Sequence, residues 1–205
     1  RVRLNEGGSV QTFTVGAVIL ATGWKPYDAT EFHSYGFGRY PNVITSVALE
    51  EMAWTGKIAR PSDGAAVHRV AIIQCEGATD EKHLPYSGNV TSLVSLKQAS
   101  YLRELYPDST VYIFYQNMQT PGKYEYFYRA VQADDGILLS QGEVQSVSED
   151  DNQNIVIEID NTLLGGSIKI EADMLVLATG MTPASMDSDA LNLGYLQGSE
   201  LPQTK

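Results

Sequence analysis

Apolar and polar positions alternate along the chain in a way that separates short buried strands from longer amphipathic helices. "RVAIIQCEG" (69–77) is a continuous apolar run closed by polar residues and a glycine, which is typical of a strand buried on both faces. "STVYIFYQN" (109–117) has the same character. Between them, "VTSLVSLKQASYLRELYP" (90–107) spaces its apolar residues like a helix and stops at a proline. "GKYEYFYRAVQADDG" (122–136) predicts a second helix.

The remainder of the second half predicts strands. The ranges 137–150, 154–161 and 166–180 show partial period-two alternation. A strand–helix–strand–helix–strand order with buried apolar strands indicates a parallel sheet with helices on its faces. Since such crossovers are right-handed, we expect an α/β chain with a Rossmann-like three-layer domain.

The first third of the chain is less regular. We expect a hairpin over the first 23 residues, with a turn at residues 5–8 and a second strand over 11–21. Residues 24–66 are punctuated by aromatic residues, glycine and proline, and carry one helix candidate, "SVALEEMAWTG" (46–56). Ser46 is the expected N-cap of this helix, and Gly56 is expected to end it.

Composition excludes several classes of function. The 205 residues are 43% hydrophobic and 19% charged, and the net charge is −11. No clustered basic surface is visible, so we expect no nucleic-acid partner, and the acidic excess suits a solvated surface. The apolar runs are far too short to cross a bilayer, so we expect no direct membrane insertion. The single cysteine excludes an internal disulfide and any metal site made of cysteines alone.

The turn after the first buried strand does not suit a dinucleotide. A nucleotide-binding turn of this fold uses several glycines so that backbone N–H groups can approach the pyrophosphate. Here only Gly77 remains, and Glu76, Asp80 and Glu81 would repel the phosphates. The second strand ends in residues 115–117, Tyr-Gln-Asn, rather than in the acidic residue that binds ribose hydroxyls. We therefore expect no NAD(P) binding of the usual kind.

The remaining reactive side chains form no recognisable catalytic arrangement. Cys75 ends a buried strand, where a thiol is either an inert small hydrophobe or a redox group, and a redox role would want a second thiol. His33, His68 and His83 lack the spacing of metal ligands and are expected at the surface or in loops.

Long stretches of the chain resemble the flavin subunit of heterodisulfide reductase. The most distinctive are "GRYPNVITS" (38–46) and "VYIFYQNMQTPGKYEYFYR" (111–129), and the match continues through "ADMLVLATGMTPAS" (172–185). The resemblance implies an FAD-dependent oxidoreductase built like thioredoxin reductase, whose FAD domain is split in sequence by an inserted NAD(P)-binding-like domain.

The resemblance also implies how the chain is divided. Residues 1–23 would end the first segment of the FAD domain, and 24–66 would be a crossover linker with a short helix. Residues 67–180 would form the inserted Rossmann domain, and 181–205 would return toward the FAD domain. The chain does not begin with Met, and we expect it to be a piece of a longer protein.

The chain departs from the family at a cysteine pattern. The family writes Tyr-Cys-Ser-x-Val-Cys-Cys before the helix at 90–107, and those cysteines are associated with iron–sulfur ligation. The matching residues here are Tyr86, Ser87, Gly88, Asn89, Val90, Thr91 and Ser92. Because thiolates hold such clusters, we expect no iron–sulfur cluster in this segment. Within the family, this loss is most similar to the A subunit of the quinone-interacting membrane-bound oxidoreductase of sulfate reducers, with the B subunit or another cluster-free relative left open.

By resemblance, the intact protein relays electrons through FAD between subunits of a heterodisulfide-reductase-like or quinone-interacting complex of anaerobic energy and sulfur metabolism. Its partners would be other subunits of that redox complex, and it would be cytoplasmic, reaching a membrane only through those partners. Two alternatives stay open: a degenerate Rossmann domain that serves only as a structural and docking module, and an NAD(P)H-dependent flavoprotein reductase. The chain lacks a glycine-rich FAD pyrophosphate loop, so we expect it to bind FAD weakly or not at all and to be inactive by itself.

Two copies of Ala-Thr-Gly supply the candidate FAD contacts. They end the apolar runs of "AVILATGWKP" (17–26) and "DMLVLATGMTP" (173–183). A glycine lets the backbone close on a cofactor, although a Thr-Gly pair can also merely end a strand. The residues that we expect at FAD are Ala21, Thr22, Gly23, Trp24, Thr179 and Gly180. Trp24 and Tyr27 would either pack near the adenine or cover the crossover.

Overall fold

The computed structural model describes residues 12–17, 19, 21–75, 88–162, 165–184, 195–196 and 203–204. Its helices are α1 (Ser46–Trp54), α2 (Gly88–Leu105) and α3 (Tyr124–Gln132), with two short 3₁₀ turns, η1 (Ala29–Glu31) and η2 (His33–Tyr35). The strands are β1 (Trp24–Pro26), β2 (Val43–Thr45), β3 (Arg69–Gln74), β4 (Thr110–Tyr115), β5 (Ile137–Glu149), β6 (Ile155–Asn161), β7 (Gly166–Ala172), β8 (Met174–Ala178), β9 (Met181–Pro183), β10 (Tyr195–Leu196) and β11 (Gln203–Thr204).

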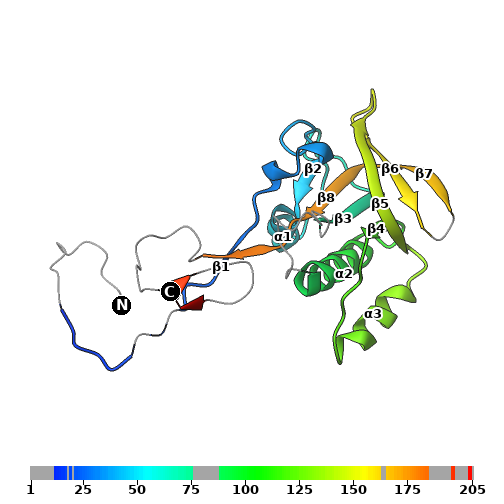
Figure 1. Cartoon of the computed structure of the whole chain (residues 1–205). Helices are drawn as coiled ribbons and strands as arrows, with labels where there is room; N and C mark the ends of the chain where they lie inside the picture. The colour runs from blue at the N-terminus through cyan, green and yellow to red at the C-terminus, as the bar shows by residue number, and fades with distance from the viewer. Residues whose placement is uncertain are drawn as a thin grey trace.

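Seven strands form one sheet in the order β2-β8-β3-β4-β5-β6-β7 (Figure 1). The first five strands of that order are parallel to one another, and β5, β6 and β7 continue as an antiparallel meander. The parallel part places the carboxyl ends of β2, β8, β3 and β4 at one edge, where ligands of open α/β sheets bind.

A single long strand joins the parallel and antiparallel parts. Residues 137–141 of β5 pair with β4, and 142–149 pair with β6. Gly142 lies at this change, and a Cβ added there would stand 2.2 Å from the carbonyl oxygen of Asp160. Only glycine allows the two backbones to approach so closely, so this residue permits the strand to change partners.

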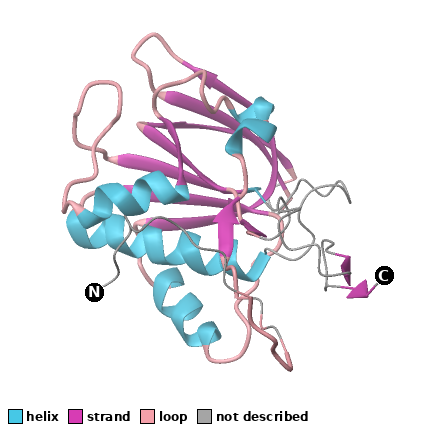
Figure 2. Cartoon of the chain, turned by 90° about the vertical axis from the view of Figure 1, so that its left-hand side faces the viewer, coloured by secondary structure: helices cyan, strands magenta, loops and turns pink. Residues whose placement is uncertain are grey.

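Alternate residues of the parallel strands face two separate cores. One core receives Val70, Ile72, Val111 and Ile113 from the sheet, and the three helices α1, α2 and α3 cover it. The opposite core receives Ala71, Ile73, Phe114, Leu175 and Leu177, and the side chains of β6 and Phe32 cover it. Figure 2 shows the three long helices together on one side of the strands.

The expected α/β Rossmann-like fold is confirmed, as are the strands near 69–74 and 110–115 and the helices near 90–107 and 122–136. The third layer differs from the expectation of helices on both faces, because the meander folds over the second face. The reason lies in residues 155–159, where every second side chain is a fully buried isoleucine, the period of a strand.

The expected hairpin over the first 23 residues is wrong for the part that the structure describes. Residues 12–17, 19 and 21–23 belong to no strand, and the rest of this expectation lies outside the described residues. Phe13, Val15 and Ile19 are 75%, 59% and 91% exposed. A strand needs a neighbouring strand to pair with, and none of the described strands pairs with this segment.

The start of α1 also differs by one residue from the expectation. Thr45, not Ser46, is the N-cap, and its Oγ1 accepts a hydrogen bond of 3.2 Å from the backbone N–H of Ala48. The expected stop is confirmed, since Gly56 follows the helix with φ of 74°.

Residues 24–66 do more than connect two parts of the chain. β2 pairs with β8 as the edge strand of the sheet, and Leu49 and Ile58 are fully buried in the helix-side core. The division of the chain at residues 23, 66 and 180 stays a prediction.

Candidate functional site

The two Ala-Thr-Gly segments meet in a two-stranded antiparallel ribbon made of β1 and β9, which we call the crossover ribbon. Lys25 pairs with Thr182 at its centre. The backbone N–H of Tyr27 donates to the carbonyl oxygen of Gly180 at 3.2 Å, and that of Ala184 donates to Gly23 at 3.0 Å. Figure 1 shows the ribbon leading away from the sheet, so both passages of the chain leave the domain at one place.

Both glycines of the repeat take a left-handed backbone conformation, with φ of 73° at Gly23 and 78° at Gly180. This conformation turns the chain sharply, and glycine adopts it without the steric strain that a Cβ would cause. The sequence repeat thus marks two equivalent turns, one on each strand of the ribbon.

The six residues expected at FAD differ in accessibility. Thr179 is buried, with 1% exposure, whereas Ala21, Thr22 and Gly23 are exposed. A Cβ added at Gly23 would meet nothing within 4 Å, so a planar ligand has room to approach this backbone. Trp24 is 60% exposed, and Gly180 is half-buried.

Tyr27 points toward the domain instead of away from it. Its ring lies 5.5 Å from that of Phe32, which belongs to the core under the meander. Burial, followed by the charges of Glu31 and Asp28, raises the pKa of the Tyr27 hydroxyl. Of the two roles expected for Tyr27, this position supports covering the crossover.

A cavity of about 240 Å³ opens beside the ribbon. It lies at the carboxyl ends of β2 and β8, between the first turns of α1 and α2. Its walls include Trp24 and Met181 from the ribbon, Val47 and Glu50 from α1, and Val94 and Lys97 from α2. Most of these side chains are apolar, so the cavity suits an apolar or aromatic group.

One charge pair crosses the wall of this cavity. Lys97 Nζ lies 2.8 Å from Glu50 Oε1, and Gln98 Nε2 donates to the same oxygen at 3.0 Å. The Gln98 amide also donates to the carbonyl oxygen of Ser46 at 2.7 Å, which joins α2 to the start of α1. Sequence reasoning missed these residues because their partners lie 47 and 52 positions away, on another helix.

The described residues do not form a complete binding site for FAD. Among them, no glycine-rich turn leads from a strand into a helix, and β2 passes directly from Thr45 into α1. The cofactor's pyrophosphate therefore finds no backbone cradle in the described part of the chain.

The expectation about NAD(P) falls largely outside the described residues, which omit 76–87. At the end of β4, the carbonyl oxygen of Gln116 accepts a hydrogen bond of 2.9 Å from Gln141, and Asn117 is exposed. The absence of NAD(P) binding stays a prediction.

The positions that match the family's cysteines are partly described. Tyr86 and Ser87 lie outside the described residues, whereas Thr91 and Ser92 are buried in the first turns of α2. Ser92 Oγ lies 3.3 Å from Gln74 Oε1 and accepts a hydrogen bond of 3.1 Å from the backbone N–H of Gln119. This hydroxyl is thus built into the polar contacts between α2 and the ends of β3 and β4.

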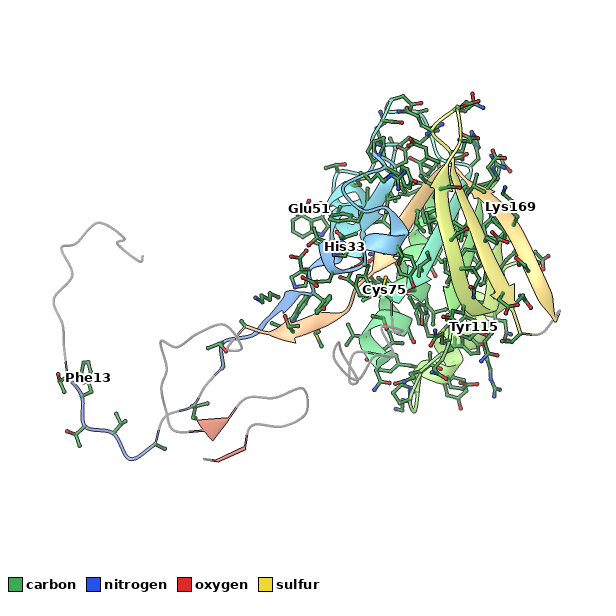
Figure 3. The ribbon with its side chains drawn as sticks, turned by 45° about the horizontal axis from the view of Figure 1, so that its top comes forward. Phe13, His33, Glu51, Cys75, Tyr115 and Lys169 are labelled. Carbon is green, nitrogen blue, oxygen red and sulfur yellow. The ribbon has the colours of Figure 1, made fainter. Side chains whose placement is uncertain are left out.

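Cys75 is buried at the end of β3, and its burial raises the pKa of the thiol. A protonated, enclosed thiol is a poor nucleophile, which supports the inert role. His33 and His68 are exposed, as expected, and His83 lies outside the described residues. Figure 3 shows His33 and Cys75 on neighbouring parts of the domain.

Neither a metal-ion cluster nor a membrane-spanning helix is found in the described part of the chain. No group of three or more of its His, Cys, Asp or Glu side chains is placed to hold a metal ion. None of its helices combines the length and hydropathy that a membrane crossing requires.

Comparison with known proteins identifies relatives over most of the chain. It is 39% identical over 177 residues to the second iron-sulfur A subunit of CoB–CoM heterodisulfide reductase from Methanopyrus kandleri, and 38% identical over 195 residues to the iron-sulfur A subunit of the same enzyme from Methanocaldococcus jannaschii. These matches cover 82% and 91% of the chain but only 27% and 29% of the relatives. No family model matches the chain.

Among solved structures, thioredoxin reductase from Giardia duodenalis aligns with 86% of the chain and 47% of its own length. The TM-score is 0.50 and the identity is 12%, so this likeness concerns the fold alone.

Proposed function

The chain belongs to the family of heterodisulfide reductase A subunits, and we propose from this that it is part of an FAD-dependent oxidoreductase subunit that relays electrons between partner subunits. The chain spans less than a third of the length of these relatives. In this proposal it contributes the inserted domain and its two connections to the FAD domain, and the rest of the FAD site lies elsewhere in the polypeptide.

The crossover ribbon is the observation that carries the proposal. A domain inserted into another needs one passage out and one passage back, and hydrogen bonds between the two passages keep them together. β1 and β9 form such a pair, with Gly23 and Gly180 turning the chain at its ends. In this proposal, the FAD domain covers the exposed apolar side chains of Phe13 and Ile19.

The proposed task of the ribbon residues is to contact and orient the cofactor. Ala21, Thr22 and Gly23 offer exposed backbone, and Trp24 offers an exposed aromatic face. Thr179 is buried directly after β8 and leads the chain into Gly180. When bound, FAD supplies the electron transfer itself, and the protein supplies position and electrostatics.

The subunit that we propose carries no iron–sulfur cluster at the start of α2. Hydroxyl-bearing residues replace the cysteines there, and the Ser92 hydroxyl takes part in hydrogen bonds with Gln74 and Gln119. This loss favours an A subunit of the quinone-interacting type, working in sulfur metabolism, over a heterodisulfide reductase subunit of the cluster-bearing type.

Two matched substitutions test the contact with FAD in the complete subunit. Gly23→Ala and Gly38→Ala place a Cβ at similar φ angles, 73° and 75°, and neither added Cβ meets an atom within 4 Å. Both variants carry the same strain, about 1–2 kcal/mol, so a difference between them reports position alone. We expect Gly23→Ala to lower the FAD content severalfold, read from the flavin absorbance of the purified subunit, and Gly38→Ala to leave it unchanged.

Equal FAD content in the two variants would contradict the contact. Titration of the 205-residue chain with FAD should show weak or no binding, and a stoichiometric yellow complex would overturn the proposal that the site is completed elsewhere. Calorimetric titration of the same chain with NADH and NADPH tests the reductase alternative, which tight binding of either nucleotide would favour.

A further inference from the structure

Two large aromatic side chains are exposed on the elements around the crossover ribbon. The chain has two tryptophans, Trp24 and Trp54, and they are 60% and 94% exposed. Scattered exposed apolar residues need no explanation, but these two stand on β1 and α1, the elements that border the apolar cavity. Tryptophan is also the residue type most enriched at the energetic centres of protein interfaces.

The exposed side of α1 forms a continuous stripe. Val47, Glu51 and Trp54 are spaced by four and three residues, so they lie along one side of the helix, and all three are exposed. Val47 also forms part of the cavity wall together with Trp24 and Met181 of the ribbon. Stripe, cavity and ribbon therefore make one surface, and Figure 3 shows Glu51 on the side of the domain toward the ribbon.

The position of the ribbon limits what can cover this surface. Both passages of the chain leave here, and the hydrogen bond between Ala184 and Gly23 holds them together up to that point. Whatever continues from the two strands is tethered within a few residues of Trp24. The relatives have more than twice as much sequence outside the matched region as inside it, which is ample for a folded domain.

We infer that the FAD domain of the same polypeptide docks on the surface made by Trp24, Val47, Glu51, Trp54 and the cavity, and places an apolar side chain in that cavity. This inference rests on the proposed function, because it takes the ribbon as a connection between domains. The docking surface should be apolar with a basic rim. Glu50 is neutralised by Lys97, whereas Glu51 forms no ion pair within the described part of the chain and faces outward.

Hydroxyl-radical footprinting with mass spectrometry tests the docking directly. The oxidation rate of Trp54 is compared between the dilute 205-residue chain and the complete FAD-loaded subunit. Tyr126 serves as the internal control, since it is 74% exposed and lies on α3, which Figure 1 shows away from the ribbon. In the complete subunit, we expect a severalfold loss of Trp54 oxidation and no change at Tyr126.

Three results would overturn the inference. Equal oxidation of Trp54 in both proteins would show that nothing in the polypeptide covers it. If Trp54 of the isolated chain becomes more protected as the chain concentration rises, a second copy of the chain covers the surface. If Trp54 is protected only after partner subunits are added, those subunits cover it.

A substitution gives an independent readout. Trp54→Ser removes an almost fully exposed side chain, so it should leave the Tm of the 205-residue chain unchanged and lower that of the complete subunit. Tyr126→Ser should change neither Tm. If Trp54→Ser leaves the Tm of the complete subunit unchanged, this result contradicts the docking. The flavin absorbance of the unsubstituted complete subunit is read separately, because its absence would refute the proposed function whatever the footprint shows.

Discussion

At the scale of single residues, a close backbone contact decides where the sheet can change from parallel to antiparallel pairing. Gly142 lies where β5 leaves its parallel partner and begins its antiparallel one. Its α-carbon faces the carbonyl oxygen of Asp160 at a distance that admits no side chain. The local sequence "SQGEV" indicates a strand glycine, but nothing near it in sequence predicts the approach of β6.

Gly142→Ala should therefore destabilise the chain. The added methyl group would collide with backbone that cannot move independently, and overpacking of this kind costs about 1–3 kcal/mol. Urea unfolding measures the loss, with Gly166→Ala as the control because a Cβ there meets nothing within 4 Å. Equal unfolding free energies for the two variants would show that the strands can separate without cost.

A second residue-scale effect concerns Asp134, which joins α2 to the turn between α3 and β5. Arg103 Nε donates to both of its carboxylate oxygens, at 3.0 and 3.1 Å, and the N–H of Gly136 donates to one of them at 2.8 Å. These bonds hold the pKa of Asp134 below its ordinary value, and the hydrogen bonds from Arg103 have the largest effect. A carboxylate with a lowered folded-state pKa stabilises the fold above its unfolded pKa, and this stability is lost as the pH falls through the folded value.

Asp134→Asn should lower the free energy of unfolding at pH 7, and the difference from the unsubstituted chain should shrink as the pH falls below about 4. Chemical unfolding at several pH values measures this. Asp135→Asn is the matched control, with the same change of charge one residue along. A difference that stays constant down to low pH would exclude the ionised pair as its cause.

At the scale of elements, the boundary of α1 shows how local signals compete. Thr45 and Ser46 are both good caps by type, and the periodic apolar pattern cannot choose between them. The choice follows from β2, because pairing of Thr45 with Leu177 holds its backbone extended, with φ of −90° and ψ of 160°, and an N-cap requires such a backbone.

Thr45→Ala should cost about 1 kcal/mol of stability, and Ser46→Ala much less, because only the Thr45 hydroxyl caps the helix. Thermal or urea unfolding of the two variants measures the contrast. If the Ser46 variant proves the less stable of the two, the cap has been assigned to the wrong residue.

At the scale of the whole molecule, the crossover ribbon organises what is proposed. It makes residues 157 positions apart into neighbours, Lys25 beside Thr182, and it sets the direction in which the chain continues. The FAD content of the Gly23→Ala variant and the oxidation of Trp54 both test the arrangement of the whole molecule. Each measurement depends on polypeptide beyond the described domain.

The sequence by itself determined the buried strands, the two longer helices, the order of the elements and the presence of two copies of Ala-Thr-Gly. These follow from local periodicity and from a repeated motif, and both are written in neighbouring residues. The likeness to heterodisulfide reductase subunits was also readable from the residues alone.

Tertiary structure alone decided the rest. The meander on the second face depends on the close approach of Gly142 to β6. The exposure of Phe13, Val15 and Ile19 reflects the lack of a paired strand among the described residues. The cavity depends on α1 and α2 lying side by side, where Lys97 pairs with Glu50. Each of these features depends on which residues far apart in sequence come into contact. No local pattern of apolar and polar positions specifies which distant surface will lie against a given surface.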